Sequence, residues 1–151
     1  MSFTALQNNM ALKYFICDYA RADWGKTSTL KLVIRKLGTP VSTKTSGADE
    51  WAMFKVVTNS GAVKCVVVAT AGDPQSVQPQ WLQEAVNCKA DIVVCAARQR
   101  GSTIHNVSTI LRGNGYEEIW FQNFYTEQPI GIGTMNDIMA DAIVQLIYQL
   151  P

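Results

Sequence analysis

The sequence predicts a three-layer α/β fold, in which a mostly parallel sheet of about five strands lies between two layers of helices. Short apolar runs of strand length alternate along the chain with segments whose apolar residues recur at helical spacing. Val66, Val67 and Val68 are apolar at consecutive positions, which is typical of a central strand covered on both faces. The length of 151 residues suits one domain, so we expect residues 1–151 to form a single unit.

The strands are predicted from the short apolar runs. They are expected at residues 13–18, 52–58, 63–70, 91–97 and 118–124. Only the four residues 59–62 separate the second run from the third, and a connection this short requires an antiparallel hairpin. Residues 39–50 are rich in serine, threonine and glycine and have no apolar period, so we expect a loop there.

The helices are predicted from apolar residues that recur on one face. They are expected at residues 26–37, 78–88, 103–113 and 134–150. Gly38 and Pro40 support the end of the first helix, because glycine is favoured just past a helix and proline cannot continue it. Ile138, Ala142 and Ile143 belong to the apolar stripe of the last helix, which we expect to face the core.

The composition argues against several classes of function. The formal net charge of +1 gives no electrostatic basis for strong direct nucleic-acid binding. The chain has neither a run of about 18 apolar residues, as a membrane span requires, nor a secretory signal pattern at its start. The four cysteines lack metal-ligand spacing and are interpreted as reduced thiols, so we expect a cytoplasmic protein.

Residues 20–27 carry the main functional motif. They match the phosphate-binding (Walker A) pattern G-x-x-x-x-G-K-[ST], except that Ala20 replaces the first glycine. The motif lies between an apolar strand and an amphipathic helix, where backbone N–H groups and a positive helix end face phosphates. Lys26 is expected to contact the β- and γ-phosphates, and the Thr27 hydroxyl to coordinate Mg²⁺. The cost of Ala20 is about 1 kcal/mol if the loop needs a positive φ there.

Polar or glycine-rich segments also follow three other expected strands, at residues 70–73, 98–102 and 123–126, and such strand ends gather at one edge of an α/β sheet. The expected nucleotide-contacting residues are Ala20, Arg21, Ala22, Asp23, Trp24, Gly25, Lys26, Thr27, Ser28, Gly72 and Asn123. Lys26 and Asp73 are the candidate catalytic residues, and Thr27 and Asp73 are the candidate metal ligands. Asp73 has a second interpretation as a turn residue before Pro74.

Other residues near these strand ends have two interpretations. Asp18 either orders the loop or approaches the metal, and Trp24 either covers the nucleotide or belongs to a partner surface. Arg98 and Arg100 reach a phosphate or a partner, or are solvated loop residues, the interpretation that we favour. A hydroxyl of the 39–50 segment is a candidate second Mg²⁺ ligand.

Over most of its length the chain resembles the P-loop NTPases, and two branches compete. The predicted hairpin and the Ala69-Thr70-Ala71-Gly72 turn resemble Ras-type GTPases, whose D-T-A-G glycine senses the γ-phosphate. Residues 21–27 resemble the K-G-G-x-G-K-T motif of ParA/MinD-type partition ATPases, with Arg21 at the lysine that reaches across a dimer. Asn123 would contact adenine in that branch, and the guanine motif N-K-x-D is incomplete at residues 123–126, which favours ATP.

The resemblance implies a Mg²⁺-ATP-dependent switch with slow hydrolysis, an ATP-dependent homodimer and a protein partner, with a role in positioning DNA or protein cargo. The first alternative is a GTP-binding switch of the Ras type. The second is a degenerate domain that has kept the fold and acts as a nucleotide-independent interaction module, as Ala20, Ala69 and the altered base motif suggest.

Overall fold

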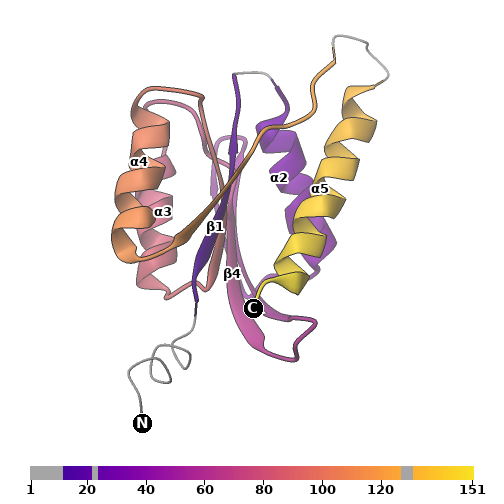
Figure 1. Cartoon of the computed structure of the whole chain (residues 1–151). Coiled ribbons are helices and arrows are strands. Elements are labelled where there is room, and N and C mark those ends of the chain that lie inside the picture. Colours follow the sequence, from indigo (N-terminus) through magenta and orange to yellow (C-terminus); the bar gives the residue numbers. More distant parts are fainter. Residues whose placement is uncertain (1–11, 22–23, 127–130) are drawn as a thin grey trace.

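The computed structural model describes residues 12–21, 24–126 and 131–151. Within these residues a six-stranded mixed sheet carries α2 and α5 on one face and α3 and α4 on the other (Figure 1). The elements in chain order are β1 Tyr14–Tyr19, α2 Lys26–Leu37, β2 Ser42–Ser46, β3 Asp49–Val57, β4 Val63–Ala69, α3 Gln78–Asn87, β5 Ile92–Ala97, α4 Ser102–Ile110, the 3-10 helix η1 Arg112–Asn114, β6 Glu117–Phe121 and α5 Ile132–Gln149. The predicted three-layer α/β arrangement is therefore confirmed.

The strand order across the sheet is β2-β3-β4-β5-β1-β6. The β4–β5, β5–β1 and β1–β6 pairs are parallel, whereas β2–β3 and β3–β4 are antiparallel. The predicted hairpin is thus confirmed as β3 and β4. β5 lies between β1 and β4, although it follows both in sequence.

The expected loop at residues 39–50 is wrong, because β2 and the start of β3 lie there. β2 has the sequence Ser-Thr-Lys-Thr-Ser, and its residues are exposed except for the half-buried Lys44. It pairs with β3 alone and forms an edge of the sheet. A largely exposed edge strand needs no apolar period, so its pattern resembles that of a loop, while its two threonines favour extended backbone.

Alternate residues of the central strands contribute to two cores. On the side of α3 and α4, Phe15 and Cys17 of β1 pack with residues such as Val67, Val93 and Leu82. On the side of α2 and α5, Ile16 packs with residues such as Leu30, Val68, Val94 and Ile143. All six residues of β5 are buried, as a strand covered on both faces requires. The cysteines are free thiols, and three of them, Cys17, Cys65 and Cys95, are buried.

The predicted ends of one strand and one helix differ from the structure by three residues each. The strand expected at 118–124 ends at Phe121, so Asn123 follows the strand. The helix expected at 103–113 ends at Ile110 and is followed by η1. In the part of the chain described here, none of the helices combines the length and hydrophobicity that crossing a bilayer requires.

Candidate functional site

Ala20 continues β1 into the loop. Its backbone N–H donates to the Ala97 carbonyl at 3.1 Å, which extends the β1–β5 pairing by one residue, and the side chain is fully buried. Its φ is not positive. The conformational cost that a missing first glycine would impose therefore does not arise. Ala22 and Asp23, which were also expected in the site, lie outside the described residues.

Gly25 is the N-cap residue of α2 and has left-handed backbone geometry, with φ 87° and ψ 15°. A Cβ built on it would lie 2.7 Å from Oδ1 and 3.0 Å from Nδ2 of Asn136. Both the positive φ and this contact require glycine. Gly25 has no side chain to cap α2, so the backbone N–H groups of the first turn have no capping side chain as a hydrogen-bond partner among the described residues.

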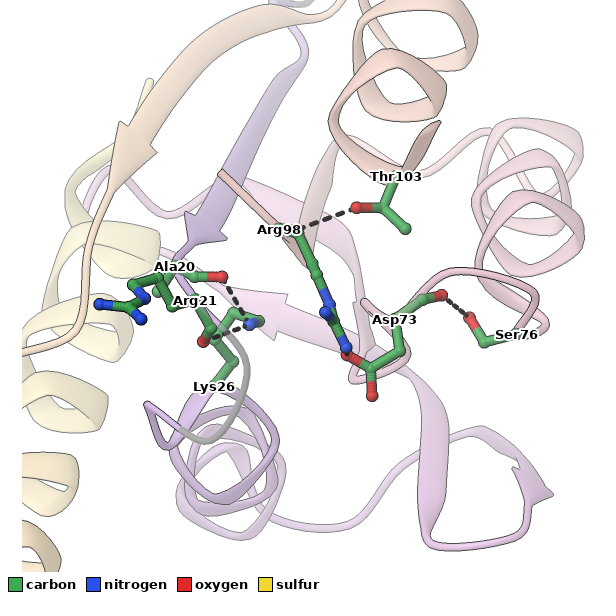
Figure 2. A network of polar contacts seen from close by, with 7 residues as sticks. All are labelled: Ala20, Arg21, Lys26, Asp73, Ser76, Arg98 and Thr103. Carbon is green, nitrogen blue, oxygen red and sulfur yellow. Dashed lines mark hydrogen bonds and ion pairs between the residues drawn. The ribbon is translucent and has the colours of Figure 1, made fainter. Parts of the chain in front are cut away.

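The Lys26 side chain turns back onto its own loop (Figure 2). Its ammonium donates to the carbonyl oxygens of Ala20 at 2.7 Å and Arg21 at 3.0 Å, and the residue is only 7 % exposed. Burial lowers the pKa of Lys26, although the negative charges of Asp18 and Asp73 oppose this shift. The lysine therefore closes the loop by contacts that a stronger acceptor, such as a phosphate, can replace.

Asp18 lies beneath the loop, at the end of β1. The residue is fully buried, and neither carboxylate oxygen accepts a hydrogen bond from the described residues. Burial raises the pKa of Asp18 from 3.8 to about 7, while the positive charge of Lys26 opposes this rise. The carboxyl group is thus balanced between its charged and neutral forms near neutral pH.

A cavity of about 420 Å³ opens at the carboxyl edge of the sheet. Its lining comes from the start of α2, from the turn after β4 and from the start of α5: Gly25, Lys26, Thr27, Ser28, Gly72, Asp73, Ile132 and Asn136. Six of these eight residues were predicted from the sequence to bind nucleotide or metal. The structure therefore brings together the start of the motif helix and the distant Gly72–Asp73 turn.

Gly72 brings this turn close to β5. A Cβ on Gly72 would lie 2.7 Å from the Ala96 Cβ and 2.9 Å from the Ala96 carbonyl carbon, so the close approach requires glycine. The next residue, Asp73, is exposed and forms an ion pair with Arg98 at 3.2 Å. Mg²⁺ is commonly held by one or two carboxylates together with substrate phosphates. Asp73 and Thr27 line one cavity, so the Asp73 carboxylate and the Thr27 hydroxyl are the groups that could supply such oxygen ligands.

Asn123 does not line the cavity but connects the elements around it. It is 4 % exposed, and its Nδ2 donates to Thr29 Oγ1 at 2.6 Å and to Asn136 Oδ1 at 3.0 Å. These bonds link the segment after β6 to α2 and α5. The Asn123 Oδ1 is buried and has no hydrogen-bond partner among the described residues.

Arg21 and Trp24 also lie outside the cavity lining. The Arg21 side chain is exposed and points away from Lys26 and Asp73 (Figure 2). Trp24 stacks on Tyr125 with ring centroids 4.7 Å apart and planes at 14°. The hydroxyl residues proposed as second Mg²⁺ ligands do not line the cavity, and those at 42–46 are on β2, which three strands separate from β1.

Sequence reasoning missed Asn136 and favoured a solvated Arg98 over an Arg98 that reaches a phosphate or a partner. Asn136 is a buried polar residue on the core face of α5, which otherwise carries Ala140, Ile143 and Ile147. An asparagine within such an apolar stripe is the signal that would have revealed it, because a buried amide needs polar partners.

Arg98 is the first residue after β5, so its distance from the cavity depends on where β5 lies in the strand order.

Comparison with protein-family models, with curated proteins and with solved structures finds no match to this chain, so what the site binds is inferred from its own geometry.

Proposed function

We propose that the chain is a P-loop protein that binds Mg²⁺-ATP through the Ala20–Thr27 loop. The observation that carries this proposal is the cavity that joins the uncapped first turn of α2 to Gly72 and Asp73. The backbone N–H groups of such a turn and the positive end of the helix dipole favour a phosphate. Anion binding is further favoured by the adjacent Lys26 ammonium.

Each residue then has a defined role. Lys26 exchanges the carbonyl oxygens of Ala20 and Arg21 for phosphate oxygens, which are stronger acceptors because they are charged. The Thr27 hydroxyl and the Asp73 carboxylate hold Mg²⁺, and the ion neutralises phosphate charge when it is bound. Gly25 keeps the backbone of α2 close to the ligand.

ATP is favoured over GTP because the guanine motif N-K-x-D is incomplete at residues 123–126. The Asn123 side chain does not supply a base contact in this arrangement, since it is buried outside the cavity lining and both its Nδ2 hydrogens are used within the protein. GTP binding by a Ras-like switch is the alternative, and the same titration distinguishes the two.

Hydrolysis is proposed to be slow. Asp73 is the candidate for orienting an attacking water, but its side chain is 64 % exposed and paired with Arg98. A slow enzyme of this kind acts as a switch that a protein partner completes. We expect phosphate release by the isolated protein below about 1 s⁻¹, the lower end of the kinase range.

The deciding experiment is isothermal titration calorimetry with Mg²⁺-ATP and Mg²⁺-GTP. Lys26→Ala should weaken ATP binding by about tenfold or more, since it removes a charge-assisted hydrogen bond. The matched control is Lys31→Ala, which removes a cation from the same helix but outside the cavity lining. Equal affinity of Lys26→Ala and wild type would contradict the proposal.

A nucleotide-independent interaction module predicts a different result in thermal unfolding. Ligand at one hundred times its Kd stabilises the folded state by about 2.7 kcal/mol. Absence of stabilisation by Mg²⁺-ATP and by Mg²⁺-GTP would favour the module.

A further inference from the structure

The strand order puts Arg98 between the two parts of the proposed site. β5 lies between β1, which leads into the loop, and β4, which leads into the Gly72–Asp73 turn. Arg98 directly follows β5. In Figure 2 its guanidinium accordingly extends between Lys26 on one side and Asp73 on the other.

The backbone of Arg98 is fixed, whereas its side chain is held weakly. The Arg98 N–H donates to Thr103 Oγ1 at 2.9 Å. Its Nε and Nη2 both contact the same oxygen, Asp73 Oδ1, at 3.3 and 3.2 Å. These distances exceed the about 2.7–2.9 Å of strong charge-assisted bonds. The two side chains are 39 % and 64 % exposed, and partly exposed ion pairs of this kind are easily exchanged.

Arg98 and Asp73 both lie within electrostatic reach of Lys26. After burial and Asp18, the next influences on the pKa of Lys26 are Asp73, which raises it, and Arg98, which lowers it. A second cation so close to a lysine is unfavourable unless negative charge compensates for it. Asp73 supplies part of that charge here, and a polyphosphate would supply more.

We propose that Arg98 binds the terminal phosphate of the nucleotide and makes the site sensitive to the difference between ATP and ADP. This inference rests on the proposed nucleotide binding at the Ala20–Thr27 loop. With the Asp73 carboxylate engaged in holding Mg²⁺, the Arg98 guanidinium would be released and would turn about its fixed backbone toward the γ-phosphate. Mg²⁺-ADP has no γ-phosphate, so the guanidinium gains no phosphate partner when ADP is bound.

The test compares Mg²⁺-ATP and Mg²⁺-ADP affinities by calorimetry in wild type and Arg98→Ala. The matched control is Arg100→Ala, which removes an exposed arginine two residues away. Arg98→Ala should lose about tenfold or more in ATP affinity while its ADP affinity stays within about twofold of wild type. Arg98→Lys should recover part of the loss, because it keeps the charge without the fork.

The outcomes separate this inference from the proposed function. If wild type binds ATP but Arg98→Ala weakens ATP and ADP equally, or weakens neither, the role of Arg98 is wrong and nucleotide binding stands. If wild type binds no nucleotide, both are wrong. A circular dichroism melt of Arg98→Ala confirms that the variant is folded before it is titrated.

A second measurement tests the exchange at Asp73. In EDTA, Asp73→Asn should bind ATP more tightly than wild type, because Arg98 is then free of its partner. The gain must become smaller when Arg98→Ala is added, since loss of the Asp73 charge by itself helps ATP binding equally with or without Arg98. A gain of the same size in both backgrounds would overturn the exchange.

Discussion

The carboxamide of Asn136 lies so close to Gly25 that a single methyl group at residue 25 would come within 2.7 Å of its Oδ1. This contact joins the start of α2 to α5, and the Asn123 side chain, from the segment after β6, donates to Asn136 Oδ1. The two helices that border the cavity are thus locked together at the point where the ligand would bind.

We predict that Gly25→Ala destabilises the protein by about 1–3 kcal/mol, because alanine must adopt a positive φ and displace Asn136. The variant should also lose nucleotide binding, since the first turn of α2 moves. Urea unfolding and calorimetry measure the two effects.

Gly113→Ala is the control for this substitution. Gly113 has no atom within 4 Å of a built Cβ, and its φ is not positive. This variant should unfold like wild type. A comparable loss of unfolding free energy in both variants would mean that the positive φ of Gly25 and its contact with Asn136 are unimportant.

A second prediction concerns pH. The pKa of Asp18 rises on folding from 3.8 to about 7, so the folded state binds more protons than the unfolded state between these values. The contribution of Asp18 to stability is therefore largest below pH 4 and is lost as the pH rises to about 7, a change of roughly 4 kcal/mol.

Asp18→Asn carries no ionisable group, so the difference in unfolding free energy between the variant and wild type isolates this effect. The variant should gain stability relative to wild type as the pH is raised from 4 to 8, as urea titrations would measure. A constant difference over this range would show that Asp18 ionises normally.

A third prediction concerns the buried Asn123. Asn123→Ala leaves Thr29 Oγ1 and Asn136 Oδ1 without their donor, and such buried groups cost about 1–3 kcal/mol. Asn114→Ala serves as the comparison, because the Asn114 amide makes an exposed bond to the Ile110 carbonyl. If chemical denaturation finds the two variants equally stable, Asn123 is not the link between β6, α2 and α5 that its contacts indicate.

A fourth prediction tests the homodimer implied by the resemblance to partition ATPases. Arg21 is exposed and directed away from Lys26, so its guanidinium is available to a second subunit (Figure 2). Sedimentation velocity should show a dimer with a non-hydrolysable ATP analogue and a monomer without it. Arg21→Ala should remain monomeric, whereas Arg35→Ala, an exposed cation elsewhere in the chain, should dimerise. Dimerisation by Arg21→Ala would remove the cross-subunit role.

The sequence predicted those helices, strands and turns that are determined by residues close together in the chain. Residues 26–37 were expected as a helix and form α2, because the glycine before Lys26 and Gly38 mark its ends. The β3–β4 hairpin follows from a connection too short for any other geometry. Gly72 and Asp73 were expected beside the motif because parallel strands end at one edge.

What escaped prediction depends on distant contacts. β5 lies between β1 and β4 because it pairs with segments far apart in sequence. The position of Arg98, which follows β5, therefore could not be predicted from the residues adjacent to it in the sequence. Asn136 reaches Gly25 from the last helix, through packing that no local pattern describes. The polar β2 carries no core-facing period, so its strand conformation has a weak signal.

The central position of β5 has a consequence for how the protein forms during synthesis. β1 and β4 emerge from the ribosome before β5, yet neither pairs directly with the other, and each is joined to β5 by parallel hydrogen bonds. A nascent chain that ends before Ile92 therefore contains the glycine-lysine loop and the Gly72–Asp73 turn without the strand that aligns them. Because non-local parallel pairing is slow, we expect the candidate site to be completed late, when β5 enters the sheet.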